Sequence, residues 1–156
     1  MDGRLKQISQ MCLDKQQLLL GTEGGNIYHL NLTNFTIEES IIYQDLVIKH
    51  STEEFKVNPG AVEALHLHPN DDSKILIGYA RGLIVLWDRK EAKADKTYYA
   101  NQQLESVAVK SDGSEFISAH NDGSYITWSL SSGSTGMCEN IENVTFRPNS
   151  FYLPFL

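Results

Sequence analysis

Short apolar runs separated by glycine-containing turns recur along this chain. The clearest case lies between Lys74 and Asp88, where the runs Ile75–Gly78 and Leu83–Trp87 are rich in Ile, Val and Leu. Both runs are too short for stable helices, and the residues between them turn the chain. Gly82 in that turn can take a positive φ without the steric strain that other residues incur. The stretch therefore predicts a β-hairpin.

Two further stretches repeat this pattern. Leu18–Gly21 and Ile27–Leu32 flank a turn with two glycines, and Phe116–Leu130 contains a turn at Asp122-Gly123. The step from the second turn glycine to the third falls within the ~40–45 residues of a propeller repeat, and the first step is longer by roughly 15. The aligned glycines are Gly25, Gly82 and Gly123, and large apolar side chains follow them at one common distance, namely Leu30, Trp87 and Trp128.

Additional strand-like runs surround the hairpins. Val62–Leu67 and Leu104–Val109 each precede a hairpin, and Lys96–Ala100 follows the second one. An inner strand, two hairpin strands and an outer strand make one four-stranded propeller blade. The dipeptide Trp87-Asp88 ends the second hairpin and is the one that names a class of propeller repeat. The predicted fold is all-β, with about three WD40-type β-propeller blades that form an incomplete propeller.

The repeat pattern also sets the expected boundaries. Blades are predicted at about residues 1–46, 60–100 and 101–130, as two nearly complete blades and part of another. The charged segment near residues 38–59 is predicted to be an insertion, and helix is expected only at Phe35–His50 or in the tail. Because the pattern stops after Leu130, residues 131–156 are predicted to be a Ser/Gly linker and an irregular tail.

Composition narrows the function class. The net charge of −7 and the pI near 5.1 argue against nucleic acid as a partner, because a phosphate backbone requires a basic face. No apolar run approaches the roughly 20 residues of a transmembrane helix, and the N-terminus lacks a signal-peptide core. Cys12 and Cys138 lie far apart without further partners, so no disulfide framework is expected. These features indicate a cytosolic protein.

Several residues resemble parts of chemical sites. His66 and His68 would share one face of a strand, as metal ligands do, but no third ligand lies nearby in the sequence. The carboxylates at Asp71, Asp72 and Asp112 lie in predicted turns, where aspartate bonds its own backbone. No metal site and no cofactor are therefore predicted.

Ser118, His120 and Asp122 carry the groups of a nucleophilic triad. One strand and its turn cannot bring them into the required chain of hydrogen bonds, so no catalytic residue is predicted and the protein is not expected to be an enzyme. Ser118 and Trp128 are better explained as internal polar and aromatic packing of a blade. The histidine that often completes such a network is not evident upstream.

The hairpin tips are the predicted contact surface, because propeller loops gather on a common rim. Trp87 and Trp128 are predicted to be core residues, with ligand stacking as the alternative. For Arg81 the alternative is an ordinary solvated turn residue. The candidate partner-contact residues are Glu23, Arg81, His120 and Asn121.

Five motifs in order carry a family resemblance. They are GTEGGNIY, VNPGAVEALHLHP, KILIGYARGLIVLWDRK, QQLESV and HNDGSYITW, within residues 5–130. Together they resemble the amino-terminal propeller of the lethal giant larvae family, whose relatives include the tomosyns. The resemblance implies a non-enzymatic WD40 scaffold with two seven-bladed propellers, which regulates cell polarity, cortical actomyosin and SNARE-dependent exocytosis.

The family also implies partners and a location. Expected partners are SNARE proteins of the syntaxin class, non-muscle myosin II and a polarity-kinase complex. The expected location is the cytoplasm and the cell cortex, at the periphery of the plasma membrane, with peripheral membrane association in the full-length family. The family's kinase-regulated basic loop is expected beyond Leu130, so no phosphorylation site is assigned to this chain.

Two alternatives remain open. Three repeats are far fewer than the family's fourteen blades, so the chain is expected to be a truncated isoform or a partial gene product, and such a fragment would have little independent function. A propeller enzyme or small-ligand binder is the second alternative. In either case the terminal blades would expose apolar faces, which predicts self-association.

Overall fold

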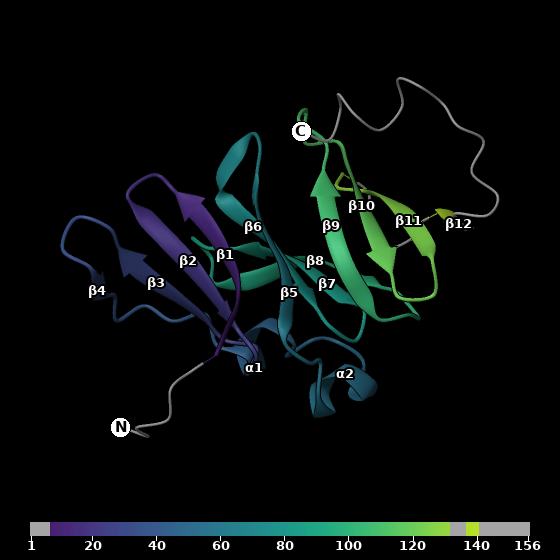
Figure 1. Cartoon of the computed structure of the whole chain (residues 1–156), viewed down its shortest axis with the longest axis horizontal. Coiled ribbons are helices and arrows are strands. Elements are labelled where there is room, and N and C mark those ends of the chain that lie inside the picture. Colours follow the sequence, from purple (N-terminus) through teal and green to yellow (C-terminus); the bar gives the residue numbers. More distant parts are fainter. Residues whose placement is uncertain (1–6, 132–136, 141–156) are drawn as a thin grey trace.

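Three antiparallel sheets account for almost all of the regular structure (Figure 1). The structure, a computed structural model, describes residues 7–131 and the main chain of residues 137–140. Each sheet has four strands in sequential order. The fold class predicted from the sequence, an all-β chain of propeller-type blades, is confirmed.

The first blade ends before the charged insertion. Its register places the turn glycine Gly25 between two paired strands, β2 and β3. Its outer strand is only two residues long, and that strand pairs with the end of β3. The strands are β1 (Ile8–Asp14), β2 (Gln17–Thr22), β3 (Ile27–Asn31) and β4 (Thr36–Ile37).

The second blade is the longest and the most buried. Its hairpin strands pair from Lys74↔Asp88 to Gly78↔Ile84, as the sequence predicts for this segment. All but the last residue of β7 are buried, because one face packs on each neighbouring blade. The strands are β5 (Val62–His68), β6 (Asp71–Tyr79), β7 (Leu83–Asp88) and β8 (Lys93–Tyr99).

The third blade corrects the expected end of the pattern. Its fourth strand, β12 (Met137–Asn140), lies beyond Leu130 and pairs with β11, although the segment was predicted to be irregular. Main-chain pairing to a free strand edge needs no apolar periodicity, which is why the sequence pattern missed it. The remaining strands are β9 (Leu104–Val109), β10 (Glu115–His120) and β11 (Ser124–Ser129). Residues 132–136 and 141–156 of the predicted tail lie outside the described residues.

The insertion between the first two blades carries two short helices, α1 (Gln44–Val47) and α2 (Glu53–Val57). The second lies beyond the segment in which helix was expected. Its only buried residue, Phe55, packs on Tyr99 with ring centroids 5.7 Å apart. One-turn helices of this kind depend on tertiary packing rather than on periodicity. Within the described residues, no helix has the length and apolar character that crossing a membrane requires.

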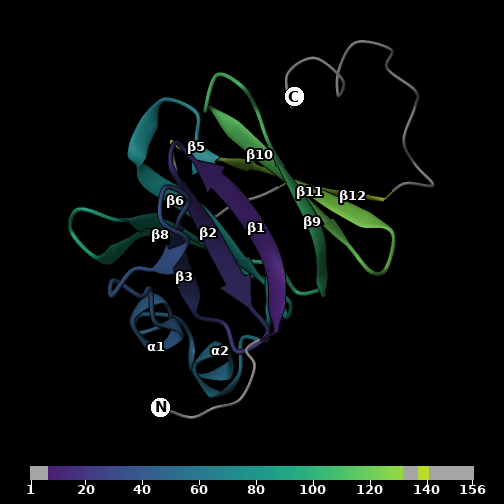
Figure 2. The same ribbon diagram turned by 60° about the vertical axis from the view of Figure 1, so that its left-hand side comes forward.

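The blades stack through two apolar interfaces. Figure 1 shows β5 between β1 and β9, and both of these inner strands contact it. Figure 2 shows the same sheets turned by 60°. Because side chains alternate along a strand, one set of residues from the second blade faces the first blade and the other set faces the third. The first interface includes Leu19, Ile27, Ile75, Val85 and Trp87; the second includes Leu76, Ile84, Tyr98, Phe116 and Trp128.

Candidate interaction surface at the hairpin tips

The three hairpin turns are built in the same way. Gly25, Gly82 and Gly123 all have positive φ, at 86°, 106° and 83°. Each glycine N–H donates to the carbonyl three residues earlier, over 3.0, 2.9 and 3.1 Å respectively. An added Cβ at Gly82 would lie 2.6 Å from the Ala100 carbonyl oxygen, so the backbone that connects β8 to β9 closes over this turn. The alignment on these glycines is therefore a structural equivalence.

Each turn is also tied to the segment that enters an inner strand. The amide of Glu23 donates to the Gln7 carbonyl over 3.0 Å, and that of Asn121 donates to the Gln103 carbonyl over 3.1 Å. In the second blade Ala80 occupies the equivalent position, and its amide donates to the Ala61 carbonyl over 2.9 Å. These bonds hold the three turns, residues 23–25, 80–82 and 121–123, along one edge, which we call the hairpin-tip rim.

Three of the four predicted contact residues lie on this rim with exposed side chains, namely Glu23, Arg81 and Asn121. Arg81 is not free, because its guanidinium donates to the Asn58 carbonyl over 2.9 Å and lies 3.5 Å from the Glu54 carboxylate. Exposed ion pairs of this kind contribute about 1 kcal/mol or less. Arg81 thus positions the insertion beside the rim and retains part of its surface for a partner.

The fourth candidate, His120, requires a correction, because it is the last residue of β10 and only 5% exposed. Its Nε2 lies 2.8 Å from Ser118 Oγ, and the indole Nε1 of Trp128 donates to the same oxygen over 2.8 Å. Its Nδ1 lies 3.2 Å from the carbonyl oxygens of Gln102 and Gln103. His120 is therefore the histidine that the sequence analysis missed, because it follows the serine instead of preceding the hairpin.

This Trp–Ser–His chain lies in the packed interior, and Asp122 is engaged elsewhere. Asp122, the third member of the apparent triad, accepts hydrogen bonds from the amide and hydroxyl of Ser124, and these bonds hold the pKa of its carboxyl below the usual range. The serine hydroxyl lies in the packed interior between the second and third blades, fully buried. Both tryptophans are 3% exposed, which confirms their prediction as core residues.

The inner end of the rim is electronegative. Burial raises the pKa of the Glu63 carboxyl on β5, and the nearby carboxylates of Glu105 and Glu23 raise it further. These three residues come from three different blades, so stacking of the blades brings the negative charges together. The effect would favour a partner with basic groups over an acidic one.

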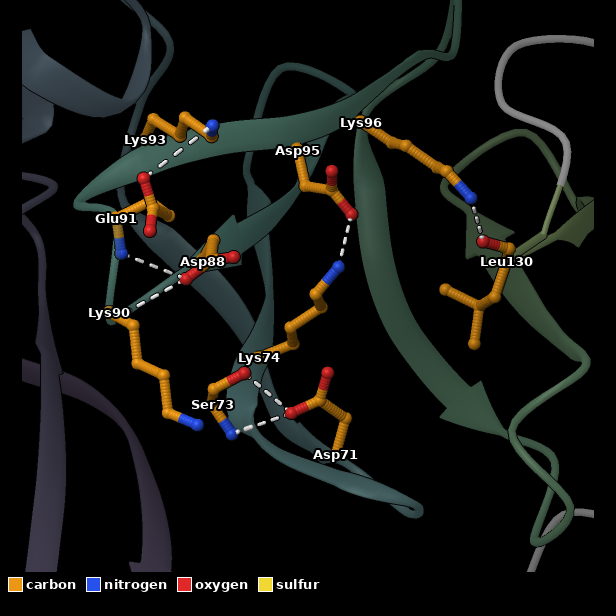
Figure 3. A network of polar contacts seen from close by, with 10 residues as sticks. All are labelled: Asp71, Ser73, Lys74, Asp88, Lys90, Glu91, Lys93, Asp95, Lys96 and Leu130. Atoms are coloured by element: carbon orange, nitrogen blue, oxygen red, sulfur yellow. Dashed lines mark hydrogen bonds and ion pairs between the residues drawn. The ribbon is translucent and has the colours of Figure 1, made fainter.

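The opposite edge is a network of turn caps and ion pairs (Figure 3). Asp71 and Asp112 each accept a bond from a nearby amide, which confirms their prediction as turn residues, and Asp88 does the same. Asp72, predicted with them, instead accepts a bond from Lys15 Nζ. Lys74 Nζ lies 2.6 Å from the Asp95 carboxylate, which raises the pKa of this lysine. His68 uses Nδ1 to accept the Asn70 amide. Within the described part of the chain, no three His, Cys, Asp or Glu side chains converge as a metal site.

The stacked four-stranded blades, with equivalent glycine turns, define a WD40-type β-propeller. A solved β-propeller domain of Cps50 (Swd1) from Myceliophteria thermophila has the same fold, with a TM-score of 0.66 at 11% identity, over 87% of this chain and 39% of that one. No protein-family model matches the chain.

The comparison of sequences identifies the family more narrowly than the fold does. Lethal(2) giant larvae protein from Drosophila melanogaster is 48% identical over 133 residues, and that from Drosophila pseudoobscura pseudoobscura is 44% identical over 152 residues. The human protein LLGL scribble cell polarity complex component 2 is 41% identical over 118 residues. The alignments cover 83%, 95% and 74% of this chain, but only 12%, 13% and 12% of the relatives. Over most of its length the chain is therefore a homologue of the lethal giant larvae proteins, as its motifs predict.

Proposed function

We propose that this chain is a non-enzymatic protein-interaction module of the lethal giant larvae type. In this proposal it contributes to cell polarity, cortical actomyosin organisation and SNARE-dependent exocytosis by binding proteins. The observation that carries the proposal is the sequence kinship with Lethal(2) giant larvae proteins, at 48% identity over 83% of the chain. The name of the human relative, which refers to a cell polarity complex, supports the same role.

The hairpin-tip rim is the surface we assign to this binding. It presents Glu23 and Asn121 to solvent from different blades, and the insertion extends it beside Arg81. The electronegative inner end, where Glu63 lies near Glu23 and Glu105, suits a basic segment of the partner. The proposed partners are syntaxin-class SNAREs, non-muscle myosin II and a polarity-kinase complex, and the proposed location is the cytoplasm and cell cortex.

A binding experiment with purified partners tests the proposal. The chain is immobilised and presented in turn with a syntaxin, a myosin II fragment and the polarity-kinase complex. The variant Glu23→Lys should weaken binding of the true partner by about tenfold, because it reverses a charge on the rim. Glu91→Lys makes the same change in charge on the opposite edge, where Glu91 lies in the β7–β8 turn, and serves as the matched control.

Two results would contradict the proposal. Equal losses in Glu23→Lys and Glu91→Lys would show that net charge, and not the rim, controls binding. Failure of all three partner classes to bind the unmodified chain would favour the alternative of a fragment with little independent function. An enzyme has less support, because the described residues bring no acid, base and nucleophile together at an accessible site.

A further inference from the structure

A cleft of about 290 Å³ lies between the first and second blades, apart from the rim turns themselves. Its walls come from four places: the start of β2 at Gln17, β3, the segment that follows β4, and the end of β7 with the turn after it. Ile42, Leu46 and Trp87 provide the apolar part of the wall, and Leu46 is half exposed at 50%. The volume suits one or two side chains rather than a large ligand.

The indole of Trp87 differs from that of Trp128 in one respect. In the third blade the N–H has Ser118 as its acceptor, whereas the equivalent residue of the second blade is Ile77, which has no hydroxyl. Among the described residues no acceptor lies within hydrogen-bond distance of Trp87 Nε1. Tyr79 Oη is the only fully enclosed side-chain polar atom without a partner in this part of the chain, so Trp87 Nε1 is not sealed in the core. The cleft is the open space that this ring lines.

His29 supplies a hydrogen-bond acceptor beside the same cleft. The residue is 6% exposed and lines the same cleft. Its Nδ1 lies 2.8 Å from the Ser40 carbonyl oxygen, so Nδ1 must carry the hydrogen. In the neutral ring Nε2 is then an acceptor, and no donor among the described residues contacts it. By the same reasoning as for Trp87, this nitrogen is not sealed in the core, and the cleft is the space that its ring lines.

Arg89 does not make the cleft cationic. Its guanidinium lies 2.7 Å from the Asp14 carboxylate, and the two side chains are 22% and 10% exposed. The charge of Arg89 is therefore balanced within the protein, so the donor of Trp87 and the acceptor of His29 act without a free charge beside them. Gln17, which also lines the cleft, adds a neutral carboxamide. A carboxylate would satisfy the indole but would oppose the lone pair of Nε2, whereas an apolar group would leave both unsatisfied.

We propose that this cleft binds the carboxamide side chain of an asparagine or glutamine in a partner protein. The amide oxygen accepts from Trp87 Nε1, and the amide N–H donates to His29 Nε2. The aliphatic part of a glutamine contacts Leu46 and Ile42 at the mouth. A carboxamide carries its acceptor and its donor on two separate atoms without a charge, whereas a Ser or Thr hydroxyl carries both on a single oxygen.

Nuclear magnetic resonance of the ¹⁵N-labelled 156-residue chain tests this directly, because Trp87 and Trp128 are its only tryptophans. The probes are three capped amino acids, N-acetyl-glutamine, N-acetyl-glutamate and N-acetyl-methionine methylamides. The glutamine probe should shift the indole N–H resonance of Trp87 and leave that of Trp128 unchanged. Binding of such small probes is expected near the millimolar range, about tenfold tighter for glutamine than for the other two.

Variants separate the two contacts. His29→Phe removes the acceptor and should weaken binding of the glutamine probe by about tenfold. The Trp128 resonance then reports whether this variant is folded. Trp87→Phe removes the donor, and binding is then followed on the probe by saturation transfer. Trp128→Phe removes the other indole and is the matched control, which should bind as the unmodified chain does.

Three outcomes would overturn the proposal. Equal affinity for all three probes would show that the shared backbone amides bind. Preference for the glutamate probe would show an anion site. A shift of the Trp128 resonance equal to that of Trp87 would place binding elsewhere. The unmodified chain alone gives these outcomes, so the test stands even if a variant fails to fold.

Discussion

Trp128 donates its indole N–H to Ser118 over 2.8 Å, inside a blade interface where the serine is fully buried. The same serine oxygen lies 2.8 Å from Nε2 of His120, so one hydroxyl serves two ring nitrogens. In a dry interior such a chain of hydrogen bonds has no water to replace a missing member. This Trp–Ser–His chain fixes the geometry of the third blade. The first two blades lack the chain, because Leu20 and Ile77 occupy the positions equivalent to Ser118.

Ser118→Ala should therefore lower the free energy of unfolding by about 1–3 kcal/mol, since it leaves two buried ring nitrogens unsatisfied. Urea unfolding followed by circular dichroism measures the change. Ser106→Ala, which removes an exposed hydroxyl from the neighbouring strand β9, is the matched control and should change stability little. Equal effects in the two variants would show that the network contributes nothing.

Replacing Gly82 with alanine should lower the stability of the folded chain. Its φ of 106° is strained for any residue with a Cβ, at about 1–3 kcal/mol. In addition, the new atom would lie 2.6 Å from Ala100 O and 2.7 Å from Gln102 O. Gly24→Ala is the control, because the nearest atom to its added Cβ is 3.9 Å away. Thermal unfolding compares them, and a similar midpoint for both variants would contradict the constraint.

The ion pair between Asp14 and Arg89 should stabilise the contact between the first two blades. Its atoms lie 2.7 Å apart in a largely buried position, whereas Lys15 and Asp72 form a nearby pair with side chains 77% and 67% exposed. A double-mutant cycle with Asp14→Asn and Arg89→Gln should give a coupling energy of about 1–3 kcal/mol. The cycle with Lys15→Gln and Asp72→Asn should give less than about 1 kcal/mol. Equal couplings would mean that burial does not strengthen the pair.

Stability should fall when His66 is protonated. Burial lowers the pKa of this histidine from its ordinary 6.5, against a smaller opposing effect of a backbone bond with Val107. The unfolded chain then binds more protons in the window just below 6.5, so the stabilising contribution is present above that pH and is lost as the pH falls through the window. Burial lowers the pKa of His68 as well, so this histidine adds to the same loss.

Denaturant unfolding at neutral pH and in mild acid measures this loss. His66→Gln should reduce it, and His50→Gln, at an exposed position, should not. The capping carboxylates act in a different range, because hydrogen bonds hold the pKa values of Asp71 and Asp112 below the ordinary 3.8. An unchanged pH dependence in His66→Gln would assign the loss to other groups.

The free face of the first blade should drive self-association. Register places Leu13, Leu18, Leu30 and Ile37 in one row across its four strands, and Leu13 and Ile37 are 62% and 53% exposed. Positions equivalent to Leu18 and Leu30 in the second blade are Ile75 and Trp87, which are buried against the first. An apolar face of this kind normally receives another blade.

Sedimentation velocity of the 156-residue chain measures the association. The double variant Met11→Glu, Leu13→Lys changes this face without altering the net charge and should shift the chain towards monomer. Val57→Glu, at a residue 85% exposed in the insertion, is the control. A compact monomer for the unmodified chain would contradict the prediction.

The sequence by itself determined the repeated unit. Glycine turns, short apolar runs and two tryptophans at one common distance are local properties, because a tight turn requires positive φ and a buried strand requires apolar residues on both faces. These signals were sufficient to predict the blades, the core tryptophans and the kinship with the lethal giant larvae family. They also assigned Asp71 and Asp112 correctly as residues that bond the backbone of a turn, but not Asp72, which pairs with Lys15.

Only the tertiary structure decided what depends on contacts between distant segments. Helix α2 forms because Phe55 meets Tyr99, and β12 forms because β11 offers a free edge, and neither cause is visible in a local pattern. His120 lies beside a turn in the sequence, yet the neighbouring segment closes over it and makes it part of the core. His29 and Trp87 likewise line one cleft only because β3 and β7 lie close together in the folded chain. The sequence alone does not bring these two residues together.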